Sequence, residues 1–300
     1  MSLIEVDDVH RVYGSGRFGG RTVHALRGVS FAVERGERFG IVGESGSGKS
    51  TLIRLLAGLD RPTSGMVRFD GREVSGRSER QLRFLREQLQ VVFQDPMSSL
   101  DPRMNVRQIV SEPLIGTRHP DPVGRVRELL AAVGLEAGAA DRYPHQFSGG
   151  QRQRISIARA LAPQPSVLIA DEPVSALDVS VRAQILNLLA DLVDEFALTM
   201  VFVSHDLSVV RRVCDRVAVL RDGELVEVGT TEQVYSDRAQ PYTRQLVAAI
   251  PTIERALAGV DAEQLAGQVA AAGGAPEKSA PDGSAPDGSA PVGARKDEEG

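Results

Sequence analysis

Runs of β-branched and aliphatic residues alternate with segments of helical periodicity over the first 250 residues of the chain. Short apolar runs bounded by polar residues or glycine are typical of buried strands. Strands that alternate with helices predict an α/β fold, in which helices pack on a central sheet. We expect strands at residues 29–33, 38–42, 66–69, 90–93, 167–170, 200–203 and 217–220.

Two turn signals and one long amphipathic pattern refine this prediction. Asp70-Gly71 and Asp222-Gly223 each stand between two strand-like runs, as hairpin turns do, so we expect antiparallel strands at the edges of the sheet. Apolar side chains at helical spacing predict a helix over residues 179–196 with one face on the sheet. These side chains are Val181, Ile185, Leu188, Leu192 and Phe196.

Three other segments differ from this alternating pattern. Residues 95–165 hold helical patterns and few strand signals, so we expect a helical subdomain inserted between two halves of the sheet. Residues 251–272 are rich in alanine and weakly periodic, which favours a short C-terminal helical extension. Residues 273–300 repeat the motif Ser-Ala-Pro and contain almost no large apolar side chain, which predicts a disordered, low-complexity tail.

Composition and charge exclude several classes of protein. Apolar residues make up 42% of the chain and charged residues 25%, which is ordinary for a globular protein. No segment of about 18 residues is apolar enough to span a bilayer, and the start of the chain lacks the pattern of a secretory signal, so we expect a cytoplasmic protein. The net charge of −5 disfavours nucleic acid as a partner. The single cysteine, Cys214, excludes an internal disulfide, and no Cys/His cluster has metal-ligand spacing.

The strongest chemical signal is a phosphate-binding loop at residues 43–50. They read Gly-Glu-Ser-Gly-Ser-Gly-Lys-Ser, which fits the pattern G-x-x-x-x-G-K-[ST] between a predicted strand and a helical run. Glycines let backbone N–H groups curl around phosphates, and the helix N-terminus adds partial positive charge. We expect Lys49 to neutralise the β- and γ-phosphates of a bound nucleotide and Ser50 to offer its hydroxyl to Mg²⁺. The predicted nucleotide-binding residues of this segment are Gly43, Ser45, Gly46, Ser47, Gly48, Lys49, Ser50 and Thr51.

A second signal is the acidic pair Asp171-Glu172, which ends an apolar strand-like run. A phosphate loop needs a carboxylate at the end of a neighbouring strand, so we expect Asp171 to hold the Mg²⁺ shell. Glu172 is placed to orient and deprotonate the water that attacks the γ-phosphate. Alone, such a pair is also typical of a solvated turn. The phosphate loop upstream favours the catalytic interpretation.

Between these two signals, residues 147–154 read Phe-Ser-Gly-Gly-Gln-Arg-Gln-Arg and precede a helical run. This segment resembles the signature of the ABC ATPases, which begins Leu-Ser-Gly-Gly-Gln, with Phe147 in place of leucine. The resemblance covers about residues 1–250. It implies an ABC-type P-loop ATPase domain with a mixed sheet core, antiparallel edge strands and the inserted helical subdomain. It also implies that Ser148, Gly149, Gly150 and Gln151 contact ATP.

Further family motifs follow in the expected order. Gln94 resembles the Q-loop glutamine, which senses Mg²⁺ and nucleotide, and His205 resembles the switch histidine, which contacts the γ-phosphate. Asp178 ends a segment similar to the D-loop and joins the nucleotide-binding residues by this resemblance. Tyr13 stands in the usual place of the adenine-stacking aromatic residue. Phe18 competes for that role, and a core or loop role for Tyr13 stays open.

The family resemblance has consequences for assembly. ABC ATPases pair head to tail, so Ser148 and Gly150 of one subunit are expected to close over ATP held by the phosphate loop of the other. Each signature segment opens a helix, whose N-terminal dipole suits a γ-phosphate. ATP would then hold the dimer together, and hydrolysis would release it. The second subunit is either a sister ATPase or another copy of this chain.

Longer stretches around the motifs are similar to the ATP-binding subunits of peptide and nickel importers, in particular to the second, F-type, subunit. Residues 239–246 and 250–251 resemble the C-terminal His-Pro-Tyr-Thr element of these subunits, with Gln240 in place of histidine. The resemblance implies a peripheral subunit at the cytoplasmic face of the cell membrane. Its partners would be two membrane permeases and an extracytoplasmic solute-binding protein. Peptides are the favoured solute, and nickel, glutathione and oligosaccharides are the alternatives.

Two other functions fit the sequence less well than the importer does. A non-transport ABC ATPase that acts on a ribosome or on DNA usually has two fused ATPase halves or a long coiled-coil insertion, whereas this chain has one motif set. A scaffold protein with an inactive ATP site is disfavoured because Lys49, Asp171, Glu172 and His205 are all present. Both comparisons favour the ATP-hydrolysing importer subunit.

Overall fold

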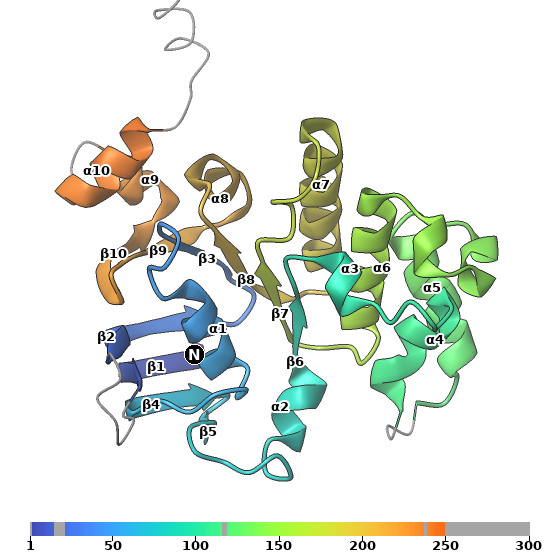
Figure 1. Cartoon of the computed structure of the whole chain (residues 1–300), viewed down its shortest axis with the longest axis horizontal. Helices are drawn as coiled ribbons and strands as arrows, with labels where there is room; N and C mark the ends of the chain where they lie inside the picture. Colours follow the sequence, from blue (N-terminus) through green and yellow to red (C-terminus); the bar gives the residue numbers. More distant parts are fainter. Residues whose placement is uncertain (1, 15–21, 116–118, 237–238, 250–300) are drawn as a thin grey trace, which may run out of the picture. The chain divides into compact units, whose positions relative to one another are not determined.

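The central sheet of the computed structural model is parallel except at one edge (Figure 1). The structure describes residues 2–14, 22–115, 119–236 and 239–249. Within them, the strand order is β10-β9-β3-β8-β7-β6, and only β10 runs antiparallel to its neighbour. The strands are β3 (Arg38–Val42), β6 (Leu89–Val92), β7 (Val167–Asp171), β8 (Thr199–Ser204), β9 (Arg216–Arg221) and β10 (Glu224–Thr230). Parallel strands are covered on both faces, which explains their continuous apolar runs.

A second sheet, entirely antiparallel, contains the N-terminal strands. Its order is β2-β1-β4-β5, with β1 (Ser2–Tyr13), β2 (Val23–Glu34), β4 (Ser64–Phe69) and β5 (Arg72–Glu73). All seven strands expected from the sequence are present, and the mixed α/β fold is confirmed. The hairpin at Asp70-Gly71, however, belongs to this second sheet and not to an edge of the central one. Strand β1 escaped prediction because charged residues interrupt its apolar alternation.

Both predicted hairpin turns have the geometry that joins antiparallel strands. Asp70 and Gly71 have φ values of 49° and 71°, and Asp222 and Gly223 have φ values of 50° and 83°. Two consecutive left-handed residues form a type I′ turn, whose twist matches that of the strands it joins. Aspartate and glycine are the residues that adopt this conformation at the lowest cost.

Helices cover both faces of the central sheet (Figure 1). Helix α1 (Lys49–Leu56) packs between the two sheets, where it shares a core with Val167 and Ile169 of β7. Helices α6 (Gly149–Leu161), α7 (Val179–Glu195) and α8 (Leu207–Val213) cover the other face, with Leu168 and Ala170. The predicted helix over 179–196 is therefore confirmed as α7. Successive side chains of a strand point to opposite faces of the sheet, so neighbouring residues of β7 pack into different hydrophobic cores.

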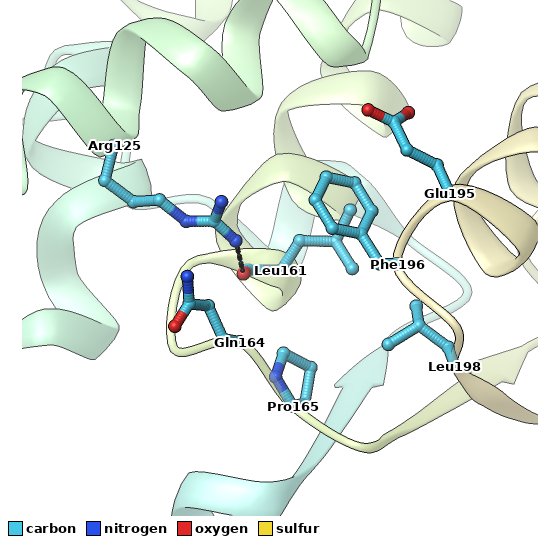
Figure 2. A pocket seen from close by; sticks show the side chains of 7 residues that line it. All are labelled: Arg125, Leu161, Gln164, Pro165, Glu195, Phe196 and Leu198. Carbon is cyan, nitrogen blue, oxygen red and sulfur yellow. Dashed lines mark hydrogen bonds between the residues drawn. The ribbon is translucent and has the colours of Figure 1, made fainter.

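The described residues between β6 and β7 form helices and turns but no strand. Their α-helices are α3 (Pro96–Ser99), α4 (Val106–Ser111), α5 (Pro122–Ala132) and α6, with short 3₁₀ turns between them. The side chain of Arg125, in α5, contacts the neighbouring elements of this region (Figure 2). This side chain is 3% exposed, and its guanidinium donates a 2.8 Å hydrogen bond to the Leu161 carbonyl at the end of α6. It also lies 5.6 Å from the ring centroid of Phe196, so it links α5 to the ends of α6 and α7.

Three short helices complete the described fold: α2 (Arg83–Gln88), α9 (Thr231–Val234) and α10 (Pro241–Ala248). Residues 1–250 cluster as one compact unit. The predicted helix in 251–272, the predicted tail in 273–300 and Phe18 lie outside the described residues. Within the described part, no helix is both long and apolar enough to cross a membrane.

Candidate nucleotide-binding site

The phosphate loop connects the end of β3 to the start of α1. Lys49 is the first residue of α1, and its side chain folds back over the loop. Its ammonium group donates hydrogen bonds to the carbonyl oxygens of Gly43, at 2.7 Å, and Glu44, at 2.8 Å. The residue is 7% exposed. The loop therefore holds one cation at its centre, with the first N–H groups of α1 beside it.

Backbone hydrogen bonds from neighbouring segments hold the phosphate loop in place. The N–H of Gly223, in the β9–β10 turn, donates to the Ser47 carbonyl at 3.1 Å, and the Arg27 N–H donates to the Gly223 carbonyl at 2.8 Å. Gly48 has φ 107°, and a Cβ there would lie 2.6 Å from the Ala25 carbonyl oxygen. The last glycine of the motif is thus required both by the backbone conformation and by contact with β2. The hydroxyl of Ser47 is buried and has no hydrogen-bond partner among the residues that the structure describes.

Two carboxylates lie at the carboxyl end of β7. Asp171 is the last residue of the strand, and Glu172 follows it with φ 46°, an uncommon conformation for a residue other than glycine. The Glu172 N–H donates to the Val203 carbonyl at 2.9 Å, and its carbonyl accepts from the Ser175 hydroxyl at 3.1 Å. These bonds fix the backbone where the strand ends. Strain held by its surroundings is a feature of functional sites.

The side chain of Glu172 contacts the predicted switch histidine. His205 follows β8, and its Nδ1 lies 3.1 Å from Oε1 of Glu172. The carboxylate is 16% exposed and the imidazole 57% exposed, so the histidine faces open space while the acid is sheltered. A sheltered carboxylate with one polar partner is suited to accept a proton from a bound water.

Burial shifts the pKa values of the two charged groups at the centre of the site. The pKa of Asp171 is raised to about 6, because of burial and the neighbouring Glu172 carboxylate, despite the opposing charge of Lys49. The pKa of Lys49 is lowered by burial, although Glu172 and Asp171 oppose this shift. The charged form of each group is therefore costly in the ligand-free protein.

A groove of about 740 Å³ lies beside the phosphate loop. Nine predicted residues line it, namely Ser45, Gly46, Gly48, Lys49, Ser50, Thr51, Gln94, Glu172 and His205. Gln94 also lines an adjoining space with Asp171, whereas Gly43 and Ser47 are buried beneath the groove. The hydroxyl of Ser50, the amide of Gln94 and the carboxylate of Asp171 offer the hard oxygen ligands that Mg²⁺ prefers. This donor set fits a magnesium ion that completes its shell with phosphate oxygens and water.

Five further groove residues were not predicted: Val23, His24, Ala25, Glu44 and Leu246. Glu44 is a variable position of the phosphate-loop pattern. The other four come from the start of β2 and from α10, and no pattern in the sequence links these segments to the phosphate loop. They reach the groove through sheet pairing and packing of the chain's C-terminal part.

The signature segment does not line this groove. Ser148 caps the N-terminus of α6 by accepting the Gln151 N–H, and the Gln151 side chain accepts the Ser148 N–H in return. Ser148, Gly149 and Gln151 are exposed. Gly150 is buried, and a Cβ there would lie 2.5 Å from Val181 at the start of α7. The segment is an exposed, preformed helix start that does not line the groove of its own phosphate loop.

The structure also places Asp178 and Tyr13 outside the groove lining. Asp178 is exposed and precedes α7, with no hydrogen bond from its side chain to the helix start. Tyr13 ends β1, and its hydroxyl donates to Asp60 at 2.7 Å. Its partner across the sheet, Val23, does line the groove. Tyr13 is thus adjacent to the groove.

The raised pKa of Asp171 predicts a stability effect with a definite sign. A carboxyl group whose pKa is higher in the folded protein destabilises that state when ionised, so the cost is complete above pH 6 and disappears as pH falls toward 4. We expect Asp171→Asn to raise the free energy of unfolding of the ligand-free protein at pH 8, by up to about 3 kcal/mol. The gain should shrink when melting is measured at pH 5. With Mg²⁺ and ATP present, the wild type should be stabilised more than the variant.

Asp178→Asn serves as the matched control, because this exposed carboxylate belongs to the following loop. It should change stability by no more than about 0.5 kcal/mol at either pH. An Asp171→Asn variant that is less stable than the wild type at pH 8 without ligand would contradict the assigned burial cost.

Comparison with known proteins identifies relatives over most of the chain. The family model for ABC transporters matches residues 26–175. The oligopeptide transport ATP-binding protein AppF of Bacillus subtilis is 47% identical over 264 residues, which cover 85% of this chain and 80% of that protein. The dipeptide transport ATP-binding protein DppF of Haemophilus influenzae is 50% identical over 234 residues, covering 77% and 72%.

Solved structures share the fold. The ATP-binding cassette MJ0796, in a dimeric post-hydrolysis state bound to ADP and Pi, superposes with a TM-score of 0.69 at 34% identity, covering 77% of this chain and 99% of that one. The cbiO1 protein of Clostridium perfringens, part of the ABC transporter complex cbiONQ, superposes with a TM-score of 0.72 at 31% identity, covering 86% and 99%.

Proposed function

Because the chain belongs to the ABC transporter family, we propose that it is the ATP-binding and ATP-hydrolysing subunit of an importer of dipeptides or oligopeptides. The observation that carries this proposal is the contact between Glu172 and His205 at the mouth of the groove that Lys49 and the phosphate loop form. The substrate class follows the relatives, which transport oligopeptides and dipeptides by name.

In the proposed mechanism, Lys49 and the N–H groups at the start of α1 bind the β- and γ-phosphates. Ser50, Gln94 and Asp171 would hold Mg²⁺, and a bound Mg²⁺ would supply positive charge that neutralises the phosphate oxygens. Glu172 orients a water molecule in line with the γ-phosphate and accepts its proton. His205 contacts the γ-phosphate and the Glu172 carboxylate, so it keeps this carboxylate aimed at the water.

Productive hydrolysis also requires a second ATPase subunit. The exposed Ser148 and the helix start behind it are free to bind a γ-phosphate across a subunit interface. The dimeric state of the related cassette supports this arrangement. We propose a sister ATPase or a second copy of this chain as the partner, with Asp178 and the signature residues at the interface.

The complete transporter would contain two membrane permeases and an extracytoplasmic solute-binding protein, with this chain at the cytoplasmic face of the membrane. The purified protein tests the enzymatic part of the proposal. We expect ATP hydrolysis that requires Mg²⁺ and stops when EDTA removes it. A purified, folded chain that neither binds nor hydrolyses ATP in the presence of the partner subunits would refute the proposal.

The C-terminal tail gives a separate prediction. Deletion of residues 273–300 should change the rate of ATP hydrolysis by less than about twofold, because their composition cannot supply a packed wall for the groove. Deletion from residue 241 is the contrast, since it removes buried Tyr242 and the groove residue Leu246 and should lower the rate strongly. Loss of activity in the shorter deletion would show that the tail takes part in catalysis.

A further inference from the structure

A polar cluster joins the end of β1 to the segment that follows α1. It consists of Arg11, Tyr13 and Asp60. The Tyr13 hydroxyl donates to Oδ2 of Asp60 at 2.7 Å. Arg11 donates to both carboxylate oxygens, from Nε at 3.0 Å and from Nη2 at 2.8 Å. The guanidinium carbon of Arg11 also lies 4.2 Å from the centroid of the Tyr13 ring. The ring is thus held at its hydroxyl and covered by a cation on one face.

The cluster is sheltered enough for these contacts to matter. The side chains of Arg11 and Asp60 are 23% and 20% exposed. Burial raises the pKa of Asp60, but hydrogen bonds from the Tyr13 hydroxyl, the Arg61 N–H and Arg11 outweigh it, and the net shift is downward. Asp60 therefore remains a carboxylate at neutral pH. Bidentate contact with a guanidinium fixes orientation as well as adding energy.

The position of the cluster relates it to the nucleotide groove. Tyr13 lies directly opposite Val23 in the β1–β2 ladder, and residues in such a pair project from the same face of the sheet. Val23 lines the groove. Asp60 follows α1, the helix whose first residue is Lys49. One helix therefore carries the phosphate-binding lysine at its start and the anchor of Tyr13 just beyond its end.

We propose that Asp60 is a positioning residue, which fixes the Tyr13 ring beside the groove so that the ring face opposite Arg11 receives the base of the nucleotide. Arg11 supports the ring from the opposite face. The inference rests on the proposed function and adds two residues outside the recognised motifs to it. In this arrangement α1 fixes the spacing between the site of the phosphates and the site of the base.

The test distinguishes binding of the base from binding of the phosphates. In the hydrolysing complex, Asp60→Ala should raise the KM for ATP about five- to tenfold, the size of one ordinary hydrogen bond, and leave kcat within about twofold. Inorganic triphosphate has no base, so its inhibition constant against ATP should not change. Asp60→Asn keeps an acceptor for the Tyr13 hydroxyl and should recover part of the affinity. Asp141→Ala is the control, because it breaks a similar pair with Arg107 in the helical region.

A double-mutant cycle completes the test. Asp60→Ala should have no further effect on KM in a Tyr13→Ala background, because the residue acts through that ring. Equal weakening of ATP and inorganic triphosphate, or an undiminished effect in the Tyr13→Ala background, would overturn the inference and leave the proposed function intact. A wild-type complex that does not hydrolyse ATP would refute the proposed function itself.

Discussion

Glu172→Gln should lower the rate of ATP hydrolysis by about 10²–10⁴-fold while ATP binding is retained, the range expected for loss of a general base. Glutamine has nearly the same shape, and the backbone bonds of residue 172 to Val203 and Ser175 do not involve the altered group. The variant should therefore fold normally and bind Mg²⁺ and ATP. In the proposed mechanism hydrolysis opens the dimer, so ATP should trap the variant as a closed dimer, measurable by gel filtration.

The chain offers a closely matched control for this variant. Glu44 lines the same groove, but it precedes α1. Among the described residues, its side chain forms no hydrogen bond or ion pair with His205 or with the end of β7. Glu44→Gln should hydrolyse ATP at close to the wild-type rate. A Glu172→Gln enzyme with wild-type turnover would refute the assignment of Glu172 as the base.

Lys49→Ala should weaken ATP binding by about 10²–10³-fold, because charge-assisted hydrogen bonds to phosphate are lost from a sheltered site. The substitution also leaves the carbonyl groups of Gly43 and Glu44 without the donor that joins them in the ligand-free protein. Binding of a fluorescent ATP analogue measures the affinity, and the melting temperature without nucleotide shows whether the loop change has damaged the fold.

Arg35→Ala is the control for Lys49→Ala. It removes a basic side chain whose partner is Asp70, in the hairpin of the second sheet, and neither residue lines the groove. Its affinity for ATP should equal that of the wild type. Wild-type affinity for ATP in a folded Lys49→Ala variant would contradict the role of Lys49 in binding the phosphates.

The elements that sequence patterns predicted well are those whose signal is local. The buried parallel strands form continuous apolar runs, and the I′ turns at Asp70 and Asp222 carry their own conformational signal. The phosphate loop and the acids after β7 follow from chemistry that depends on spacing along the chain. The structure brings these groups together beside Lys49, as the spacing indicated.

Features that depend on contacts between distant segments were not predictable in the same way. Charged residues obscured β1, and no local pattern separates its sheet from the central one. Leu246 and His24 reach the groove through packing of α10 and pairing of β2. Asp60 lies 47 residues from Tyr13 along the chain, and only the fold joins them. The roles of these residues arise from tertiary structure.

Uptake of labelled peptide by the reconstituted complex tests whether this chain drives peptide import. The tagged chain would be purified from membranes in mild detergent with its bound subunits, identified by mass spectrometry, and reconstituted into vesicles with ATP inside and the solute-binding protein outside. We expect two polytopic membrane proteins and a sister ATPase or second copy in the complex. We also expect peptide accumulation that depends on ATP and is lost in Glu172→Gln. Recovery of ribosomal or DNA-bound partners, or no ATP-dependent peptide accumulation by the intact complex, would contradict this role in import.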